Sequence, residues 1–173
     1  MITYKERLNH IKAFVFDVDG VFTDNTILLM PSGEFLRTMN TKDGYAVKLA
    51  VDKGYLVGII SGGKSEVVTK RFNDLGVKDV YLGISNKMEV FQDFLNKHDI
   101  LASDCLYMGD DIPDYDVMKL VALAAAPKDA AEEIKNIAHY VSPYQGGKGC
   151  VRDIIEQTLR VQEKWFDVNV PSA

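Results

Sequence analysis

The sequence predicts an α/β fold in which a parallel sheet is covered by helices on both faces. Short apolar runs alternate with longer amphipathic stretches along the chain, and this alternation is typical of strand–helix–strand units. The chain has 173 residues, of which 47% are hydrophobic and 26% charged. One domain with a packed core is therefore expected over residues 1–173.

Apolar runs bounded by Asp, Gly or Ser mark the expected strands, because buried parallel strands are apolar on both faces. These runs are Ala13–Phe16, Leu56–Ile60, Val80–Leu82, Cys105–Met108 and Leu123–Ala125. The expected helices are Gly44–Lys53, Ser65–Leu75, Lys87–Lys97, Pro113–Val121, Asp129–Ile137 and Val151–Lys164. Gly54 and Gly76 are expected to end their helices, and Asp129, followed by Glu132, is expected to cap one.

One segment interrupts the alternation. Thr26–Met30 and Glu34–Met39 flank Pro31-Ser32-Gly33, which predicts a β-hairpin within an insertion over residues 23–40. Ligands of open α/β sheets bind beyond the carboxyl ends of the strands, so this hairpin should start and end near the site. Its apolar residues are Ile27, Leu28, Leu29, Met30, Phe35 and Leu36. They favour an interface, and the alternative is that half of them cover the chain's own core.

Composition argues against several classes of protein. A formal net charge of −5 gives no general attraction for nucleic acid. The longest apolar run, Leu120–Ala126, is far shorter than the ~18 residues that a membrane helix needs. Cys105 and Cys150 make no disulfide framework, so we expect a reducing compartment such as the cytoplasm. The end of the chain, residues 165–173, is expected to fray.

Two acidic clusters follow two of the expected strands. Asp17 and Asp19 come directly after the first strand, and Asp110, Asp111 and Asp114 follow the strand that ends at Met108. Because carboxylates this close repel one another, something positive should lie between them. Oxygen ligands suit a hard cation, Mg²⁺ by preference. A turn or helix cap is the alternative for either cluster taken alone.

Two further signals lie at strand ends. Ser61-Gly62-Gly63 offers a hydroxyl and consecutive backbone N–H groups that could hold an anion, although it is also an ordinary loop sequence. Lys87 begins a helix, where the macrodipole disfavours a cation. An anionic partner would explain that position, and a solvated surface lysine is the alternative.

The order of these motifs resembles the haloacid dehalogenase superfamily of phosphohydrolases. Residues Ala13 to Asp153 are similar to its capless sugar-acid phosphatases, including Asn40-Thr41-Lys42-Asp43-Gly44 and Gly146-Gly147-Lys148-Gly149. The resemblance implies a Rossmann-like fold of the superfamily's type without a cap domain. It also implies a Mg²⁺-dependent phosphatase that works through an aspartyl phosphate.

The resemblance implies a role for each matching residue. Asp17 would be the nucleophile and Asp19 the general acid/base, with Ser61 and Lys87 as phosphate ligands. Asp17, Asp110 and the backbone carbonyl of Asp19 would bind Mg²⁺, with Asp111 and Asp114 as supporting carboxylates. The residues in contact with the sugar acid would be Asn40, Lys42, Asp43, Gly44, Lys48, Gly62 and Arg71. Asp19 must begin protonated, so we expect partial burial and a carboxylate beside it.

The resemblance also implies a substrate, 3-deoxy-D-manno-octulosonate 8-phosphate (KDO 8-phosphate), whose product serves lipopolysaccharide synthesis. Gly63 departs from the arginine that is common there, and Lys64 or Arg71 would be its substitute. A nine-carbon acid, KDN 9-phosphate, or another sugar phosphate is the alternative substrate. The alternatives outside the enzyme class are a receiver-like signalling module and an inactive relative that binds sugar acids.

The missing cap domain implies an assembly. Relatives form homotetramers in which hairpins of neighbouring subunits close the sites, and residues 23–40 could do the same. The resemblance also allows the C-terminal tail to reach a neighbouring site.

Overall fold

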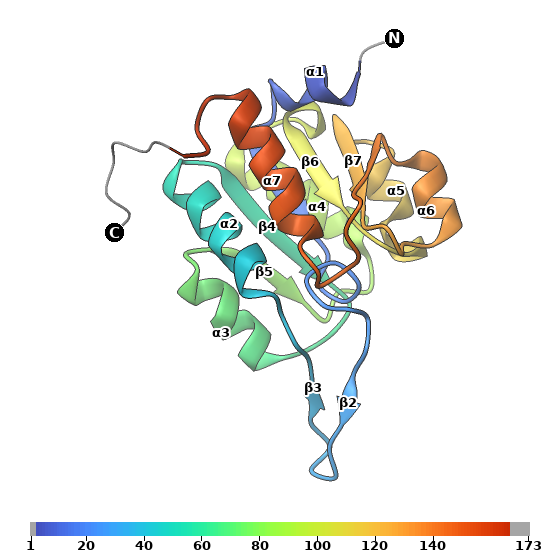
Figure 1. The fold of residues 1–173 in the computed structure, drawn as a ribbon. Helices are drawn as coiled ribbons and strands as arrows, with labels where there is room; N and C mark the ends of the chain where they lie inside the picture. The colour runs from blue at the N-terminus through green and yellow to red at the C-terminus, as the bar shows by residue number, and fades with distance from the viewer. Residues whose placement is uncertain (1–2, 167–173) are drawn as a thin grey trace.

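The computed structural model describes residues 3–166 and has a six-stranded parallel sheet between two layers of helices (Figure 1). The strand order is β5-β4-β1-β6-β7-β8. The strands are β1 (Ala13–Phe16), β4 (Leu56–Ser61), β5 (Asp79–Leu82), β6 (Cys105–Met108), β7 (Leu123–Ala126) and β8 (Tyr140–Val141). The predicted fold class is confirmed, and each of the five strands predicted for the parallel sheet lies within one residue of its observed bounds.

The helices are α1 (Tyr4–Leu8), α2 (Thr41–Asp52), α3 (Glu66–Asp74), α4 (Lys87–His98), α5 (Tyr115–Met118), α6 (Glu132–Ile137) and α7 (Cys150–Val161), with short 3₁₀ helices at Ala102–Asp104 and Ile112–Asp114. The long helix predicted over Pro113–Val121 is wrong, because a 3₁₀ turn precedes the short α5. The predicted cap at Asp129 is also wrong. Helix α6 begins at Glu132, and Asp129 Oδ1 accepts the N–H of Gly146 at 2.9 Å.

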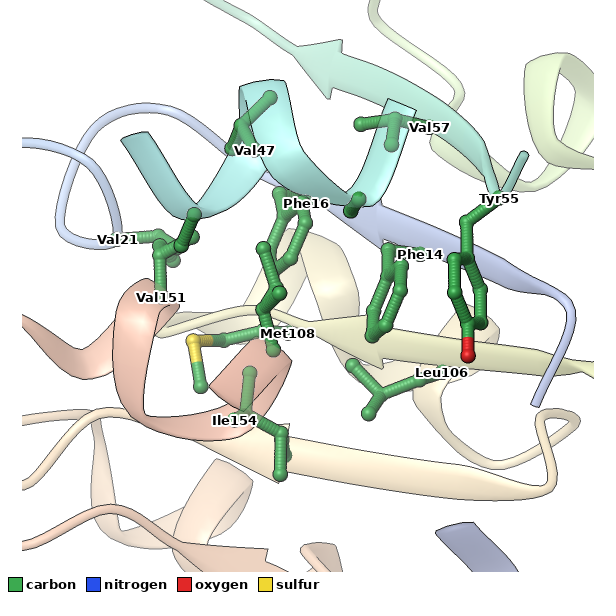
Figure 2. Close-up of a cluster of buried hydrophobic side chains, with 14 of the residues drawn as sticks. Phe14, Phe16, Val21, Val47, Tyr55, Val57, Leu106, Met108, Val151 and Ile154 are labelled. Atoms are coloured by element: carbon green, nitrogen blue, oxygen red, sulfur yellow. The ribbon is translucent and has the colours of Figure 1, made fainter. Parts of the chain in front are cut away.

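Each strand of the sheet's centre sends alternate side chains to opposite faces, which gives the fold two cores. Phe14 and Phe16 belong to one core, which is closed by helices α1, α2, α3 and α7. Ala13 and Val15 belong to the other, which is closed by α4, α5 and α6. Figure 2 shows the first core, where the two phenylalanines of β1 lie among side chains from its neighbours and from α2 and α7.

The hairpin of β2 (Leu28–Leu29) and β3 (Phe35–Leu36) projects away from this layered body (Figure 1). Its strands are shorter than predicted. All the apolar residues named for it are exposed, from 37% for Met30 to 68% for Leu29. The alternative that half of them cover the chain's own core is therefore wrong.

The chain's end packs further than predicted. Trp165 is buried and forms an edge contact with Tyr45, with the Arg152 guanidinium over its ring. Trp165 therefore belongs to the packed fold and not to the tail predicted over residues 165–173, and residues 167–173 lie outside the described part. Within residues 3–166, no helix is long and apolar enough to cross a membrane.

Helix α7 is capped from another element. Its N-cap residue is Gly149, at φ 109°, so the cap position offers no side-chain acceptor. Asp43 of α2 supplies one, because its Oδ1 accepts the N–H of Arg152 at 2.8 Å. Asp43 is fully buried, and its burial raises the pKa of the carboxyl to about 6. This contact joins the two helices that cover the centre of one face.

We predict that Asp43 makes stability depend on pH. Because the folded-state pKa lies above the unfolded value, the carboxyl favours folding less as the pH rises from about 4 through 6. Asp43→Asn removes this titration and keeps an oxygen acceptor. Urea denaturation at pH 4.5 and 7.5 should show wild type losing stability relative to Asp43→Asn as the pH rises. Parallel pH profiles would contradict this. As a control, Asp43→Ala should lose about 1 kcal/mol by removing the cap.

Candidate active site

Functional side chains from separate elements meet at the carboxyl edge of the sheet. Asp17 follows β1, Ser61 ends β4, Lys87 begins α4 and Asp110 follows β6. Together with Asp19 they line a pocket of about 290 Å³. Parallel strands β4, β1 and β6 are adjacent, which explains why residues so far apart in sequence share one pocket.

Lys87 lies between two carboxylates. Its Nζ is 2.8 Å from Asp17 Oδ2 and 2.7 Å from Asp114 Oδ1, and all three side chains are buried. Burial lowers the pKa of Lys87, but the two carboxylates outweigh it and raise the pKa above its ordinary value. The alternative of a solvated surface lysine is therefore wrong.

Asp114 holds this lysine and is itself held by four donors. Its Oδ1 accepts the hydroxyl of Tyr107 at 2.7 Å as well as Lys87. Its Oδ2 accepts the N–H groups of Asp110 at 3.2 Å and Asp111 at 3.5 Å. The neighbouring Asp111 is exposed and accepts the N–H of Ile112. Asp114 thus orients Lys87 and the turn that carries Asp110.

Carboxylate oxygens of Asp17, Asp110 and Asp114 lie within 4.8 Å of one another, an arrangement that fits a cation. The donors around Asp114 fill its oxygens, so Asp17 and Asp110 are the better pair of ligands. Burial and the charge of Asp114 raise the pKa of Asp17 to about 6, and burial with the charge of Asp17 raises that of Asp110 to about 8. A divalent cation would relieve this repulsion, and oxygen ligands suit Mg²⁺.

A glycine makes room for Asp110. A Cβ on Gly20, whose φ is +84°, would lie 2.0 Å from Asp110 Oδ2. Asn25 donates its Nδ2 to the same oxygen at 3.3 Å. Asn25 has a positive φ of 65° and is not among the residues predicted for the site. Asparagine tolerates that conformation, but nothing in the sequence pattern says which carboxylate it meets.

Asp19 has a different neighbour from the one expected. Instead of a carboxylate, the guanidinium of Arg37 faces it, with Nε 2.6 Å from Oδ1 and Nη2 3.0 Å from Oδ2. Arg37 follows the hairpin strand β3, and sequence reasoning missed it. Its side chain is only 7% exposed. The acid/base candidate is therefore paired with a cation from the insertion.

The residues predicted to contact the sugar acid fall into separate groups. Gly62 lines the pocket of Asp17, while Arg71 lines a neighbouring one and lies against Gly44. Asn40 caps α2 and lines a third pocket with Lys42. The other two line none of these pockets: Asp43 is buried as the cap of α7, and Lys48 pairs with Asp52.

The glycine-rich loop before α7 packs on the loop that follows β1. A Cβ on Gly146 would lie 2.0 Å from the carbonyl oxygen of Gly20, and the N–H of Gly147 donates to Val21 at 2.9 Å. Its glycines allow close approach to another backbone segment, which braces the loop holding Asp19.

Comparison with known proteins places the chain in a family. The family model of haloacid dehalogenase-like hydrolases matches residues 76–154. The chain is 37% identical over 158 residues to the KDO 8-phosphate phosphatase KdsC of Escherichia coli K12, a match that covers 91% of this chain and 84% of the relative. The corresponding protein of Yersinia pestis is 33% identical over 92% of this chain and 85% of its own length.

Solved structures of KDO 8-phosphate phosphatases resemble this chain over most of its length. The crystal structure of the Yersinia pestis phosphatase has a TM-score of 0.91 at 33% identity, with 93% of this chain and 87% of that chain covered. The Moraxella catarrhalis phosphatase, solved with magnesium, phosphate and KDO, has a TM-score of 0.90 at 27% identity, with 93% and 92% covered. The receiver-like alternative is therefore wrong. This chain belongs to the KdsC family of haloacid dehalogenase-like hydrolases.

Proposed function

We propose that this protein is a Mg²⁺-dependent phosphatase that converts KDO 8-phosphate to KDO and phosphate through an aspartyl phosphate on Asp17. The observation that carries this proposal is the buried cluster of Asp17, Lys87, Asp110 and Asp114 at the carboxyl edge of the sheet. The names of the relatives support the substrate.

Asp17 is placed to act as the nucleophile. Its Oδ1 accepts the N–H of Val18 at 2.6 Å and its Oδ2 faces Lys87, which fixes the carboxylate in the pocket. Attack on phosphorus forms the bond from Asp17 to phosphate as the bond to the sugar oxygen breaks. The ammonium of Lys87 and the hydroxyl of Ser61 would hold phosphate oxygens and offset their charge.

Asp19 lines the same pocket and supplies the proton chemistry. It protonates the departing sugar oxygen and then takes a proton from the water that releases phosphate from Asp17. Acid/base assistance of this kind is worth ~10²–10⁴-fold. Asp17 and Asp110, with the backbone carbonyl of Asp19, would hold Mg²⁺, which when bound supplies positive charge beside the phosphate oxygens.

The hairpin is the second part of the proposal. Its exposed apolar side chains, Leu28 and Leu29 above all, would pack against hairpins of other copies in a homotetramer and close the pockets. We also propose a cytoplasmic location, which is supported by two free, buried cysteines, Cys105 and Cys150.

Asp17→Asn should lower turnover of KDO 8-phosphate by roughly 10³-fold or more, because a carboxamide is a poor nucleophile. Phosphate release in Mg²⁺ buffer measures the effect. Asp74→Asn, a matched change at the exposed ion pair with Lys70, should leave turnover unchanged. Substantial turnover by Asp17→Asn would refute the assignment of the nucleophile.

Mg²⁺ should stabilise the folded protein, and Asp110 should be required for that effect. At a concentration of 100 times Kd, one bound ion adds about 2.7 kcal/mol. In EDTA, Asp110→Asn should melt above wild type, because the change removes a buried carboxylate that faces Asp17 and Asp114. Calorimetry with and without Mg²⁺ tests both points. An equal Mg²⁺ response in the variant would show that the ion binds elsewhere.

Replacing both Leu28 and Leu29 by Asp should reduce the mass of the assembly without unfolding the chain, because both side chains are exposed. Light scattering measures the mass and circular dichroism checks the fold. Leu101→Asp changes an equally exposed leucine outside the hairpin and should leave the mass unchanged. An unaltered mass in the double variant would contradict the interface.

A further inference from the structure

The pair between Arg37 and Asp19 engages both carboxylate oxygens. Nε donates to Oδ1 at 2.6 Å and Nη2 donates to Oδ2 at 3.0 Å, while Nη1 donates to the carbonyl of Phe35 at 3.3 Å. Two parallel bonds of this kind are the strongest that an arginine makes to a carboxylate. Each oxygen of Asp19 already accepts one N–H of the guanidinium, so the pair holds the carboxylate toward Arg37 and opposes its reorientation toward a sugar oxygen.

Gly63 is the residue that makes room for the pair. A Cβ at this position would lie 2.9 Å from Arg37 Nη2 and 2.9 Å from Asp19 Oδ2, which is closer than real Cβ atoms come to such neighbours. Any side chain at position 63 would have to displace one of the two. The absence of a side chain at Gly63 thus leaves the space that the guanidinium of Arg37, which comes from the hairpin, occupies.

Arg37 also stands between two pockets. Asp19 lines the pocket of about 290 Å³ that holds Asp17 and Lys87. Arg37 lines the neighbouring pocket of about 660 Å³ between the hairpin and α3, where Arg71 is a second guanidinium. A phosphate ester seated at Asp17 would extend past Asp19 toward Arg37, into a pocket whose arginines suit an anionic group.

We infer that Arg37 exchanges partners during the reaction. The carboxylate of a bound sugar acid takes the guanidinium and accepts its two N–H donors in place of Asp19, which frees Asp19 for the leaving oxygen. Two hydrogen bonds break and two form, and no proton or electron moves in this step. This inference rests on the proposed function. It makes Arg37 both the residue that recognises the substrate's acid group and a positioning residue for Asp19.

The exchange predicts kinetic effects of losing Arg37 that differ from those of losing a residue that only anchors the hairpin. Without the guanidinium, the carboxylate of KDO 8-phosphate loses its partner, so its KM should rise about 10- to 100-fold. The kcat for KDO 8-phosphate should not fall, because in this variant no bond to Arg37 has to break before Asp19 can act. For p-nitrophenyl phosphate, which has no carboxylate to draw Arg37 away, kcat should rise. A hairpin anchor would lower the hydrolysis of both esters together.

The test is steady-state kinetics of Arg37→Ala on KDO 8-phosphate and p-nitrophenyl phosphate in Mg²⁺ buffer. The control is Arg160→Ala, since Arg160 donates through Nε and Nη2 to Glu156 on an exposed face of α7. This change should alter neither ester's kinetics. A raised KM for KDO 8-phosphate with a raised kcat for p-nitrophenyl phosphate supports the exchange. Unchanged or lower hydrolysis of p-nitrophenyl phosphate overturns it.

Arg37→Lys keeps the inference testable if the alanine variant does not fold. Lysine keeps the charge but replaces the two-pronged donor by one ammonium, so the KM for KDO 8-phosphate should rise less than tenfold, and a wild-type KM overturns the inference. A wild-type protein that hydrolyses p-nitrophenyl phosphate but not KDO 8-phosphate refutes the proposed substrate, and the exchange with it. Equal efficiency of wild type on both esters overturns the exchange alone.

Discussion

The burial of one lysine among three carboxylates is the constraint on which the rest of this structure depends. Asp17, Asp110 and Asp114 share a small volume with Lys87, and buried charges are costly unless every one is paired and hydrogen-bonded. The fold meets that condition with Tyr107 and backbone N–H groups around Asp114. Two carboxylates more than the lysine can neutralise remain, and a divalent cation would balance their charge.

Close packing around that cluster explains why glycines surround it. A Cβ on Gly109 would lie 2.3 Å from the carboxyl carbon of Asp114, and one on Gly20 would meet Asp110. Each acidic side chain is thus seated directly on the backbone of a neighbouring turn. The rigid sheet beneath supplies the positions, since β1 and β6 are paired along their whole length.

The parallel sheet and the residues at its carboxyl edge were predictable from the sequence, because the apolar runs and acidic motifs that mark them are local. Strands such as Ala13–Phe16 are short apolar runs, and residues that follow them must lie at one edge of a parallel sheet. The two-residue strand β8 and the single-turn α1 are too short to show a periodicity. The break before α5 depends on Asp114 turning inward toward Lys87, a contact 27 residues apart in sequence.

The site residues that sequence reasoning missed depend on contacts of the same long-range kind. Arg37 and Tyr107 carry ordinary side chains for a hairpin end and a buried strand, and only the folded chain shows that they meet Asp19 and Asp114. Asp43 shows the reverse case. It lies within a motif that resembles a substrate-binding segment, yet the structure uses its carboxylate to hold another helix.

The contact between Gly63 and Arg37 also bears on how such a site can change over evolutionary time. Because the guanidinium of Arg37 and the carboxylate of Asp19 fill the space above Gly63, a larger residue there requires one of these two side chains to move. Replacing Arg37 first leaves Asp19 without its counterion until a new cation arrives. The two positions are therefore coupled, because the effect of a substitution at either one depends on the residue at the other.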